Sequence, residues 1–161
     1  ATPIKNEYRN KSEVGQDRLV NAFAAARLYG TPAIVVDFGT AITFDIVSPE
    51  SAYLGGLIMP GIELSLSSLY TKTALLPRVD LKAASSIIGR DTVSSMRGGI
   101  LFGFGAMCDG LVAQYRHILG KRAKVIATGG NAELVKKYAK SIQIVDEDLT
   151  LKGLALLAPK S

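Results

Sequence analysis

Short apolar runs alternate along this chain with longer stretches in which apolar residues recur at helical spacing. Three of the runs follow one another closely and are joined by short polar turns: 33–36, 42–47 and 53–59. This spacing predicts a meander of three strands, the last of them broken by Gly55-Gly56. Two more buried strands are expected further along the chain, at 124–127 and 142–145.

Helical periodicity predicts five helices around these strands. Ser12 is expected to cap the first, which runs to about Arg27 and stops at Gly30. The other four are expected after short turns, at 61–69, 92–118, 132–140 and 149–157. Helices that alternate with short buried strands are typical of an α/β domain with a mixed sheet, and no linker or repeat divides the chain.

The longest predicted helix has apolar residues at intervals of three, four and seven from Val93 to Ile118, yet it also holds many glycines. Each interior glycine costs about 1 kcal/mol relative to alanine. Two interpretations stay open: tight packing within the monomer, or a helix–helix subunit interface. The glycines concerned are Gly98, Gly99, Gly103, Gly105 and Gly110.

Composition indicates one folded unit. Of the 161 residues 48% are hydrophobic, so a core can form, and the formal charge of +5 is scattered over the chain. We see no nucleic-acid motif and no apolar run of the roughly 18 residues that span a membrane. The single cysteine excludes an internal disulfide and suits a cytoplasmic protein. The start at Ala1, without Met, suggests a piece of a longer protein.

Asp37 is the first candidate for chemistry. It ends a predicted buried strand, and Gly39 and Thr40 follow it in a tight turn. Backbone amides in such a turn can hold a phosphate while the carboxylate holds the accompanying metal ion. A plain hairpin turn is the alternative.

A second candidate is Thr128-Gly129-Gly130, between a predicted strand and a predicted helix. A helix start presents unpaired N–H groups and partial positive charge to an anion, which suits a nucleotide. The full G-x-G-x-x-G pattern is absent, so a Rossmann site is not expected. An ordinary strand-to-helix turn is the alternative.

A third candidate is Asp17, in the motif Gly15-Gln16-Asp17-Arg18 near the start of the first helix. An acid at this position can simply stabilise the helix dipole, or it can take a proton from a substrate hydroxyl. His117 is interpreted as a residue near the C-terminal end of the long helix, and Cys108 as a buried packing residue. A zinc site or a Cys–His nucleophile is therefore not expected.

In their order along the chain, these motifs resemble the second lobe of the acetate kinase, sugar kinase and actin-type ATPases, and more narrowly the type III pantothenate kinases. The matching stretches run through nearly the whole chain: 15–18, 36–41, 55–61, 73–77, 88–92, 128–130 and 149–154. The resemblance implies a ribonuclease H-like actin-type ATPase lobe, with a mixed β-sheet flanked by helices. It also implies a homodimeric kinase that transfers the γ-phosphate of ATP to the hydroxyl of pantothenate, the first step of coenzyme A biosynthesis.

The resemblance also implies roles for single residues. Asp17 would be the general base, with Arg18 at the transferring phosphate, and Asp37 would hold a monovalent cation, K⁺ or NH₄⁺. Substrate contacts would come from Tyr8, from Gly15 and, across the dimer, from Thr92. Contacts to ATP, which is accompanied by Mg²⁺ or another divalent cation, would come from Gly39, Thr40, Thr128, Gly129 and Gly130.

One departure from the family concerns its first lobe, which carries an Asp-x-Gly-Asn-Thr phosphate loop. No such motif occurs in these 161 residues. We therefore expect residues 1–161 to be the second lobe alone and to be inactive as a kinase by themselves. The alternative is a non-catalytic lobe, or a regulatory accessory factor that binds ligand without phosphoryl transfer.

Overall fold

The computed structural model describes residues 2–159 and is built on one six-stranded sheet with the order β1-β4-β3-β2-β5-β6. Only β3 runs against the others, because it is antiparallel to both β2 and β4 while the remaining pairs are parallel. This is the arrangement expected of a ribonuclease H-like lobe. The strands are β1 (Lys5–Asn6), β2 (Ala33–Phe38), β3 (Ala41–Val47), β4 (Ala52–Pro60), β5 (Lys124–Thr128) and β6 (Ile144–Val145).

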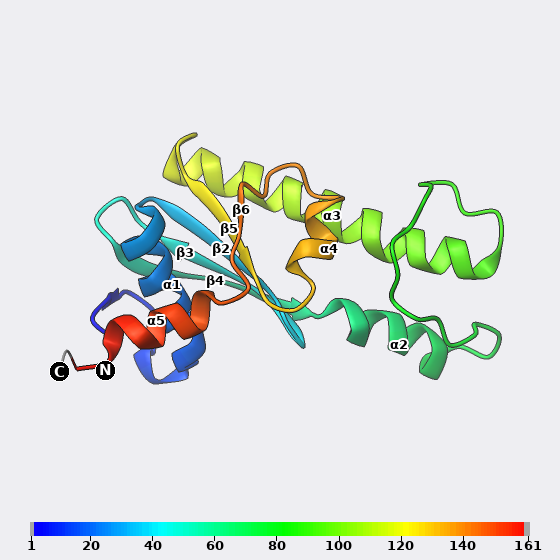
Figure 1. Cartoon of the computed structure of the whole chain (residues 1–161), viewed down its shortest axis with the longest axis horizontal. Coiled ribbons are helices and arrows are strands. Elements are labelled where there is room, and N and C mark those ends of the chain that lie inside the picture. Colours follow the sequence, from blue (N-terminus) through cyan, green and yellow to red (C-terminus); the bar gives the residue numbers. More distant parts are fainter. Residues whose placement is uncertain (1, 160–161) are drawn as a thin grey trace.

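Helices cover both faces of the sheet (Figure 1). On one face α1 and α5 pack together, and on the other α3 and α4 bury a larger apolar cluster against β2, β3 and β5. Gly153 lets the first pair approach closely, because a Cβ there would lie 2.6 Å from the side chain of Val20. The helices are α1 (Gln16–Tyr29), α2 (Ile62–Lys72), α3 (Thr92–Leu119), α4 (Ala132–Lys136) and α5 (Leu149–Leu157), with a 3₁₀ turn, η1, at Lys11–Glu13.

Strand alternation decides which polar residues face α1. Successive side chains of a strand point to opposite faces. In β2, Ile34 and Val36 belong to the core under α3, so Asp37 points to the α1 side. In β3, Phe44 and Ile46 belong to the same core, so Thr43 and Asp45 also point to α1. The two strands thus present carboxylates to a helix that carries Asp17 and Arg18.

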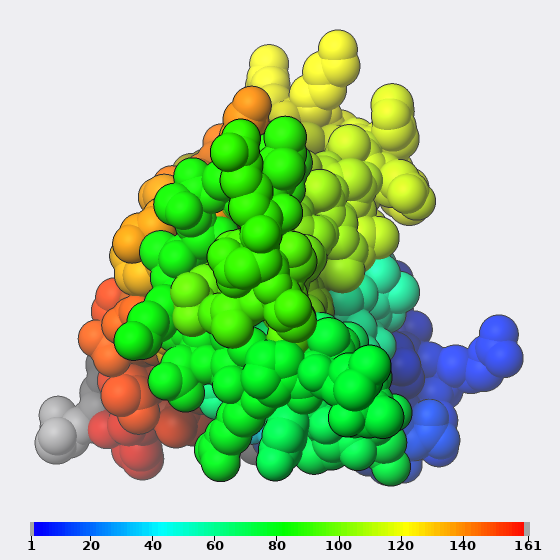
Figure 2. Space-filling view, turned by 90° about the vertical axis from the view of Figure 1, so that its right-hand side faces the viewer, coloured from blue at the N-terminus to red at the C-terminus, as the bar shows by residue number. Residues whose placement is uncertain are grey.

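An arm projects from the compact part of the molecule. It consists of α2, the N-terminal half of α3 and the loop 73–91 between them, and its tip faces the viewer in Figure 2. By length and composition α3 is long and apolar enough to cross a membrane. About a third of its most apolar stretch is buried within the chain. One such helix is weak evidence for a membrane, because helices of soluble proteins meet the same criterion.

Some glycines of α3 fit tight packing within the monomer, and others fit a helix–helix subunit interface. A Cβ at Gly105 would lie 2.3 Å from the carbonyl oxygen of Tyr138, so this glycine is required by packing within the monomer. Gly99, Gly103 and Gly110 have no atom within 4 Å of such a Cβ. The exposed side of the helix therefore has room for another chain.

The meander and all five helices are confirmed, and several boundaries are corrected. Ser12 lies in η1, and α1 begins after Gly15 instead. β4 is continuous, with a bulge near Gly55 where a break was predicted. Val93 and Ile118 are exposed, whereas Met96, Leu101, Cys108 and Val112 are the apolar residues of α3 that are buried. Two further elements are shorter than predicted: α4 ends at Lys136, and β6 begins at Ile144.

Candidate functional site

The two glycine turns predicted as candidates meet at one end of the sheet. β2 and β5 are neighbouring parallel strands that place Asp37 beside Thr128. The turns after them are joined by a hydrogen bond of 3.3 Å from the N–H of Asn131 to the carbonyl of Phe38. Between them and α2 lies a pocket of about 520 Å³, lined by Phe38, Gly39, Thr40, Glu63, Leu64, Ser67, Gly130 and Asn131.

Gly129 is the residue that lets the two turns come together. Its φ is +89°, in the region that favours glycine, and a Cβ there would lie 2.4 Å from Oδ1 of Asp37. Gly130 has open space around its Cα instead and faces the pocket. The sequence Thr-Gly-Gly therefore serves two purposes, since one glycine admits the carboxylate and the other leaves the mouth of the pocket open.

Asp37 is part-buried and belongs to a hydrogen-bonded chain from α5. Thr150 donates its hydroxyl to Oδ1 of Asn21 at 2.6 Å, and the Asn21 amide donates to Oδ2 of Asp37 at 3.2 Å. Burial raises the pKa of Asp37, the nearby charge of Asp17 raises it further, and the bond from Asn21 opposes both. Asn21 is itself buried.

We expect Asp37→Asn to stabilise the chain at neutral pH when no cation is bound. Because the folded-state pKa of Asp37 is raised, the carboxylate destabilises the fold above that pKa, and the penalty vanishes as pH falls below its ordinary value. The amide keeps an acceptor for Asn21. A gain of about 1 kcal/mol corresponds to roughly 2–4 °C in melting temperature for a domain of this size.

Asp109→Asn is the matched control, for which we expect the opposite change in melting temperature. Asp109 accepts the backbone N–H groups of Lys140 at 3.0 Å and Ser141 at 2.8 Å. Burial raises its pKa, but the bonds from Ser141 and Lys140 outweigh this and lower it. The control should therefore melt at a lower temperature than the parent at pH 7. If Asp37→Asn also melts at a lower temperature than the parent at pH 7, the buried Asp37 carboxylate does not destabilise the fold.

Asp17 lies in the first turn of α1, as predicted, and is exposed. Its carboxylate folds back over Gly15, where a Cβ would lie 2.4 Å from Oδ1 of Asp17. Arg18, the next residue, turns inward and is only 6% exposed. The helix start therefore presents an accessible carboxylate near Asp37 and, from the next residue, sends a guanidinium into the interior.

Tyr8 joins this group from the N-terminal segment. Its ring lies 3.2 Å from the position of a Cβ at Gly55 and 6.4 Å, centroid to centroid, from the ring of Tyr53. Gly55 has a φ of +110°, at the bulge of β4. The bulge therefore places Tyr8 against β4. The neighbouring strand, β3, carries Asp45, which pairs with Arg18.

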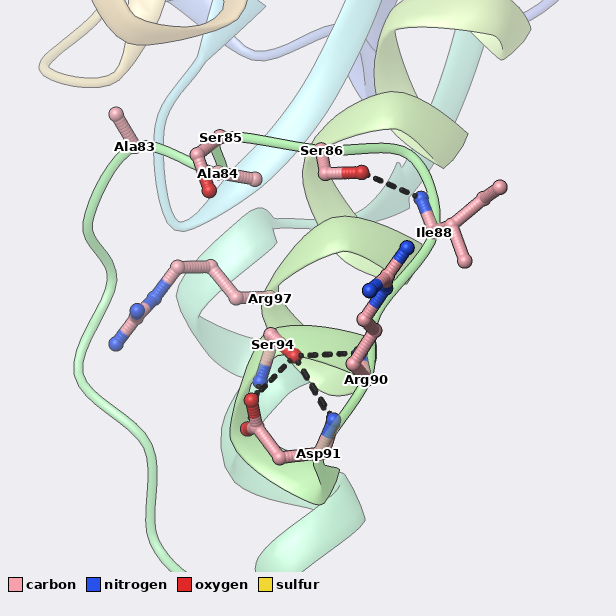
Figure 3. Close-up of a pocket in the computed structure, with 9 residues that line it drawn as sticks. All are labelled: Ala83, Ala84, Ser85, Ser86, Ile88, Arg90, Asp91, Ser94 and Arg97. Atoms are coloured by element: carbon pink, nitrogen blue, oxygen red, sulfur yellow. Dashed lines mark hydrogen bonds between the residues drawn. The ribbon is translucent and has the colours of Figure 1, made fainter.

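Thr92 is not brought to this site within the chain. It begins α3 at the far end of the arm, whereas α1 lies at the opposite end of the long axis (Figure 1). Asp91 caps the helix by accepting the N–H of Ser94 at 2.8 Å, and the Ser94 hydroxyl bonds back (Figure 3). A pocket of about 440 Å³ opens beside this cap, away from Asp17 and Asp37.

The sequence analysis missed Asp45 and Tyr53. Asp45 is fully buried in β3 and forms an ion pair of 2.7 Å with Arg18, and the Tyr53 hydroxyl donates to the same carboxylate at 2.9 Å. A signal existed, because a carboxylate inside the apolar run 42–47 needs a cationic or hydroxyl partner. Cys108 is buried as predicted, and burial raises the pKa of its thiol to about 11.

Comparison with known proteins agrees with this architecture. A sequence model of the family described as type III pantothenate kinase matches residues 1–114. A curated type III pantothenate kinase of Syntrophus aciditrophicus (strain SB) is 50% identical over 150 residues, which is 93% of this chain and 59% of that protein. The chain therefore spans less than two thirds of that relative.

Two solved structures are similar to the chain. One, described as a Baf family transcriptional activator from Campylobacter jejuni, has a TM-score of 0.59 and 25% identity, covering 97% of this chain and 67% of that one. Component A of the (R)-2-hydroxyglutaryl-CoA dehydratase from Acidaminococcus fermentans has a TM-score of 0.46 and 14% identity, covering 85% of this chain and 64% of that one. The second likeness is too weak to bear on the fold.

The strand order, with its single antiparallel strand and paired glycine turns at one sheet end, defines an actin-type ATPase lobe. Within that class, the family match over residues 1–114 is specific. The chain belongs to the type III pantothenate kinase family.

Proposed function

We propose that this chain is the second lobe of a pantothenate kinase, which transfers the γ-phosphate of ATP to the pantothenate hydroxyl. Two features support the proposal: membership of the family, and the convergence of Asp17, Arg18 and Asp37 on the α1 side of the sheet beside the two glycine turns. The convergence carries the argument, because phosphoryl transfer needs groups that position and neutralise charge rather than a covalent nucleophile.

In the proposed reaction Asp17 is the general base. Its carboxylate is exposed and can reach a substrate hydroxyl, whereas Asp37 is held by Asn21 behind it. Arg18 neutralises charge at the transferring phosphate. Pantothenate is assigned to the side of Tyr8, which lies at the bulge of β4, and of Gly15, which directly precedes α1.

ATP is proposed to lie across the glycine turns. Gly39, Thr40 and Gly130 line the pocket between the two turns and α2, and Thr128 and Gly129 directly precede Gly130 at the end of β5. Backbone amides in such turns suit phosphate oxygens, and the start of a helix adds partial positive charge. The nucleoside is assigned to the side of Thr128 to Gly130.

The residues around Asp37 fit the proposed K⁺ or NH₄⁺. Oδ2 of Asp37 is occupied by Asn21, while Oδ1 faces the space beside Gly129. When bound, a monovalent cation would neutralise a carboxylate that burial leaves poorly solvated. Among residues 2–159 no group of three or more His, Cys, Asp or Glu side chains could hold a metal ion. The Mg²⁺ of ATP is therefore assigned to the first lobe and the phosphates.

A regulatory accessory factor is the second candidate, and the likeness to a Baf family transcriptional activator favours it. ADP release by full-length protein, extended upstream to the length of the curated relative, separates the two. A kinase releases ADP in proportion to pantothenate. A protein that binds ATP or pantothenate without releasing ADP supports the accessory factor. An upstream Asp-x-Gly-Asn-Thr strand would favour the kinase in the same way.

We further propose a homodimer formed through the exposed side of α3. Gly99 and Gly103 are one turn apart and, with Phe104 and Met107, line a shallow hollow of about 160 Å³. A two-fold axis would pair this surface with itself. It would also explain why Thr92 lies far from Asp17 within one chain, since the partner's arm could deliver it. Cytoplasmic location stays a prediction.

Gly103→Leu is expected to weaken the dimer by about 5- to 150-fold while the lobe stays folded. The added side chain meets no atom of its own chain within 4 Å of Cβ, but it would overpack a close helix contact, which costs about 1–3 kcal/mol. Gly105→Leu is the contrasting variant and should unfold the chain, because its Cβ would collide with Tyr138. Sedimentation and circular dichroism measure both effects. A monomeric parent, or an unchanged dimer in Gly103→Leu, contradicts this interface.

A further inference from the structure

A fully buried carboxylate, Asp45, lies directly behind Arg18 and has no part in the reaction described so far. Its Oδ1 accepts the Nε–H of Arg18 at 2.7 Å and the hydroxyl of Tyr53 at 2.9 Å. Its Oδ2 accepts the hydroxyl of Thr43 at 2.9 Å. The carboxylate is therefore held by three donors and cannot change orientation without breaking several bonds.

The same network holds the Arg18 guanidinium on two of its three nitrogens. Nη2 donates to the carbonyl of Phe44 at 3.3 Å, and the guanidinium carbon lies 6.0 Å from the centre of the Tyr53 ring. Gly56 leaves the space for this, because a Cβ there would lie 3.3 Å from Nη2 and would collide with the Phe44 carbonyl. Backbone, ring and carboxylate together fix the plane of the guanidinium.

The third nitrogen, Nη1, has no hydrogen bond to any residue in the described range 2–159. Within that range no side-chain nitrogen or oxygen is both fully buried and without a partner. Nη1 therefore keeps contact with solvent, although the side chain of Arg18 is only 8% exposed. Two of the guanidinium nitrogens are anchored in the protein, and the third, Nη1, is free.

We propose that Asp45 is a positioning residue for phosphoryl transfer, fixing Arg18 so that its free Nη1 edge meets the transferring phosphate. The inference rests on the proposed function, in which Arg18 acts at that phosphate. An arginine has many rotamers, and one already fixed gives up less freedom when it stabilises the transition state. Preorganised charge of this kind is a large contribution to catalysis, and small misplacements are costly.

A stabilising role for the ion pair explains the arrangement less well. A buried ion pair is weak evidence for stability, since desolvation offsets much of the attraction between the charges. The chain also has a second buried carboxylate, Asp146, that is held by a tyrosine hydroxyl and a cationic side chain. Asp146 accepts the hydroxyl of Tyr29 at 2.6 Å and the ammonium group of Lys152 at 2.8 Å, but its partners join α1 to α5 and lie outside the proposed site. Asp146 is the matched control.

The test compares kcat for Asp45→Asn in two backgrounds of the full-length protein. In the parent background Asp45→Asn is expected to lower kcat on the order of 10- to 100-fold, with the KM values for ATP and pantothenate within about threefold. In the Arg18→Lys background it should lower kcat by less than about twofold, since a residue that acts only through Arg18 has nothing left to position. Asp146→Asn should leave kcat within about twofold, whatever it does to the melting temperature.

Two results would overturn the proposal: an unchanged kcat for Asp45→Asn in the parent, or an equal loss in both backgrounds, which indicates a structural role. The NMR signal of the Arg18 Nε–H adds a readout that does not need activity. It should be sharp and slowly exchanging in the parent and in Asp146→Asn, and lost in Asp45→Asn. If the parent transfers no phosphate to pantothenate, the proposed function fails. The Arg18 signal alone then decides whether Asp45 fixes the guanidinium.

Discussion

Asp17→Asn in the full-length protein is expected to lower kcat for pantothenate phosphorylation by about 10²–10⁴, the usual effect of losing a general base. Asn keeps the size of the side chain and its place over Gly15, but it cannot accept the hydroxyl proton. Because Asp17 is exposed and pairs with no cation in the described part of the chain, the fold should lose little. Steady-state kinetics with ATP and pantothenate measures the loss.

The alternative role of Asp17, as a helix-dipole acid, predicts a different result. It would change stability by about 0.3–1 kcal/mol and leave turnover intact. Glu13→Gln is a suitable control, because Glu13 is another exposed acid just before α1. It should keep both kcat and the melting temperature close to those of the parent. A near-normal kcat in Asp17→Asn would refute the assignment of the base.

The 161-residue chain alone is expected to show no measurable pantothenate-dependent turnover. It contains one Asp-x-Gly-Thr turn, at Asp37, and lacks the Asp-x-Gly-Asn-Thr phosphate loop that the family resemblance implies for a first lobe. Preorganised charge is usually the largest contribution to such catalysis, so half a clamp should not suffice. An ADP-release assay with pure chain, beside the full-length protein at equal concentration, measures the difference.

A positive control guards against a merely misfolded chain. Circular dichroism and a cooperative melt should first show that the chain is folded. Ordinary turnover from the folded chain alone would contradict the two-lobe account and place the whole phosphate clamp within these residues. Inactivity of the full-length protein as well would favour the accessory-factor interpretation over the kinase.

The sequence allowed much of the sheet and half of the site to be predicted. Apolar runs joined by short turns leave few topologies, so the meander from Ala33 to Pro60 followed from spacing alone. The two glycine turns were also identified in advance, because they come directly after buried strands. That they touch, through Gly129 and Asp37, depends on β5 pairing with β2, which local patterns do not reveal.

Other features needed the tertiary structure. Helix α1 begins at Gln16 rather than near Ser12, because Val14 and Gly15 have non-helical backbone angles that separate it from the 3₁₀ turn η1, and such a local break leaves no periodic signal. The role of Asp45 could not be predicted, because its partner Arg18 lies 27 residues away in the sequence and only the fold brings the two together. The position of Thr92 depends on the arm, whose direction no residue pattern encodes.

The most direct measurement is identification of the phosphorylated product. Full-length protein is incubated with ATP, Mg²⁺, K⁺ and an equimolar mixture of pantothenate and other small alcohols, and the products are analysed by mass spectrometry. The account predicts that pantothenate alone gains one phosphate, in step with ADP, and that Asp17→Asn forms the product far more slowly. ATP hydrolysis without phosphopantothenate, or phosphate on another alcohol, would contradict it.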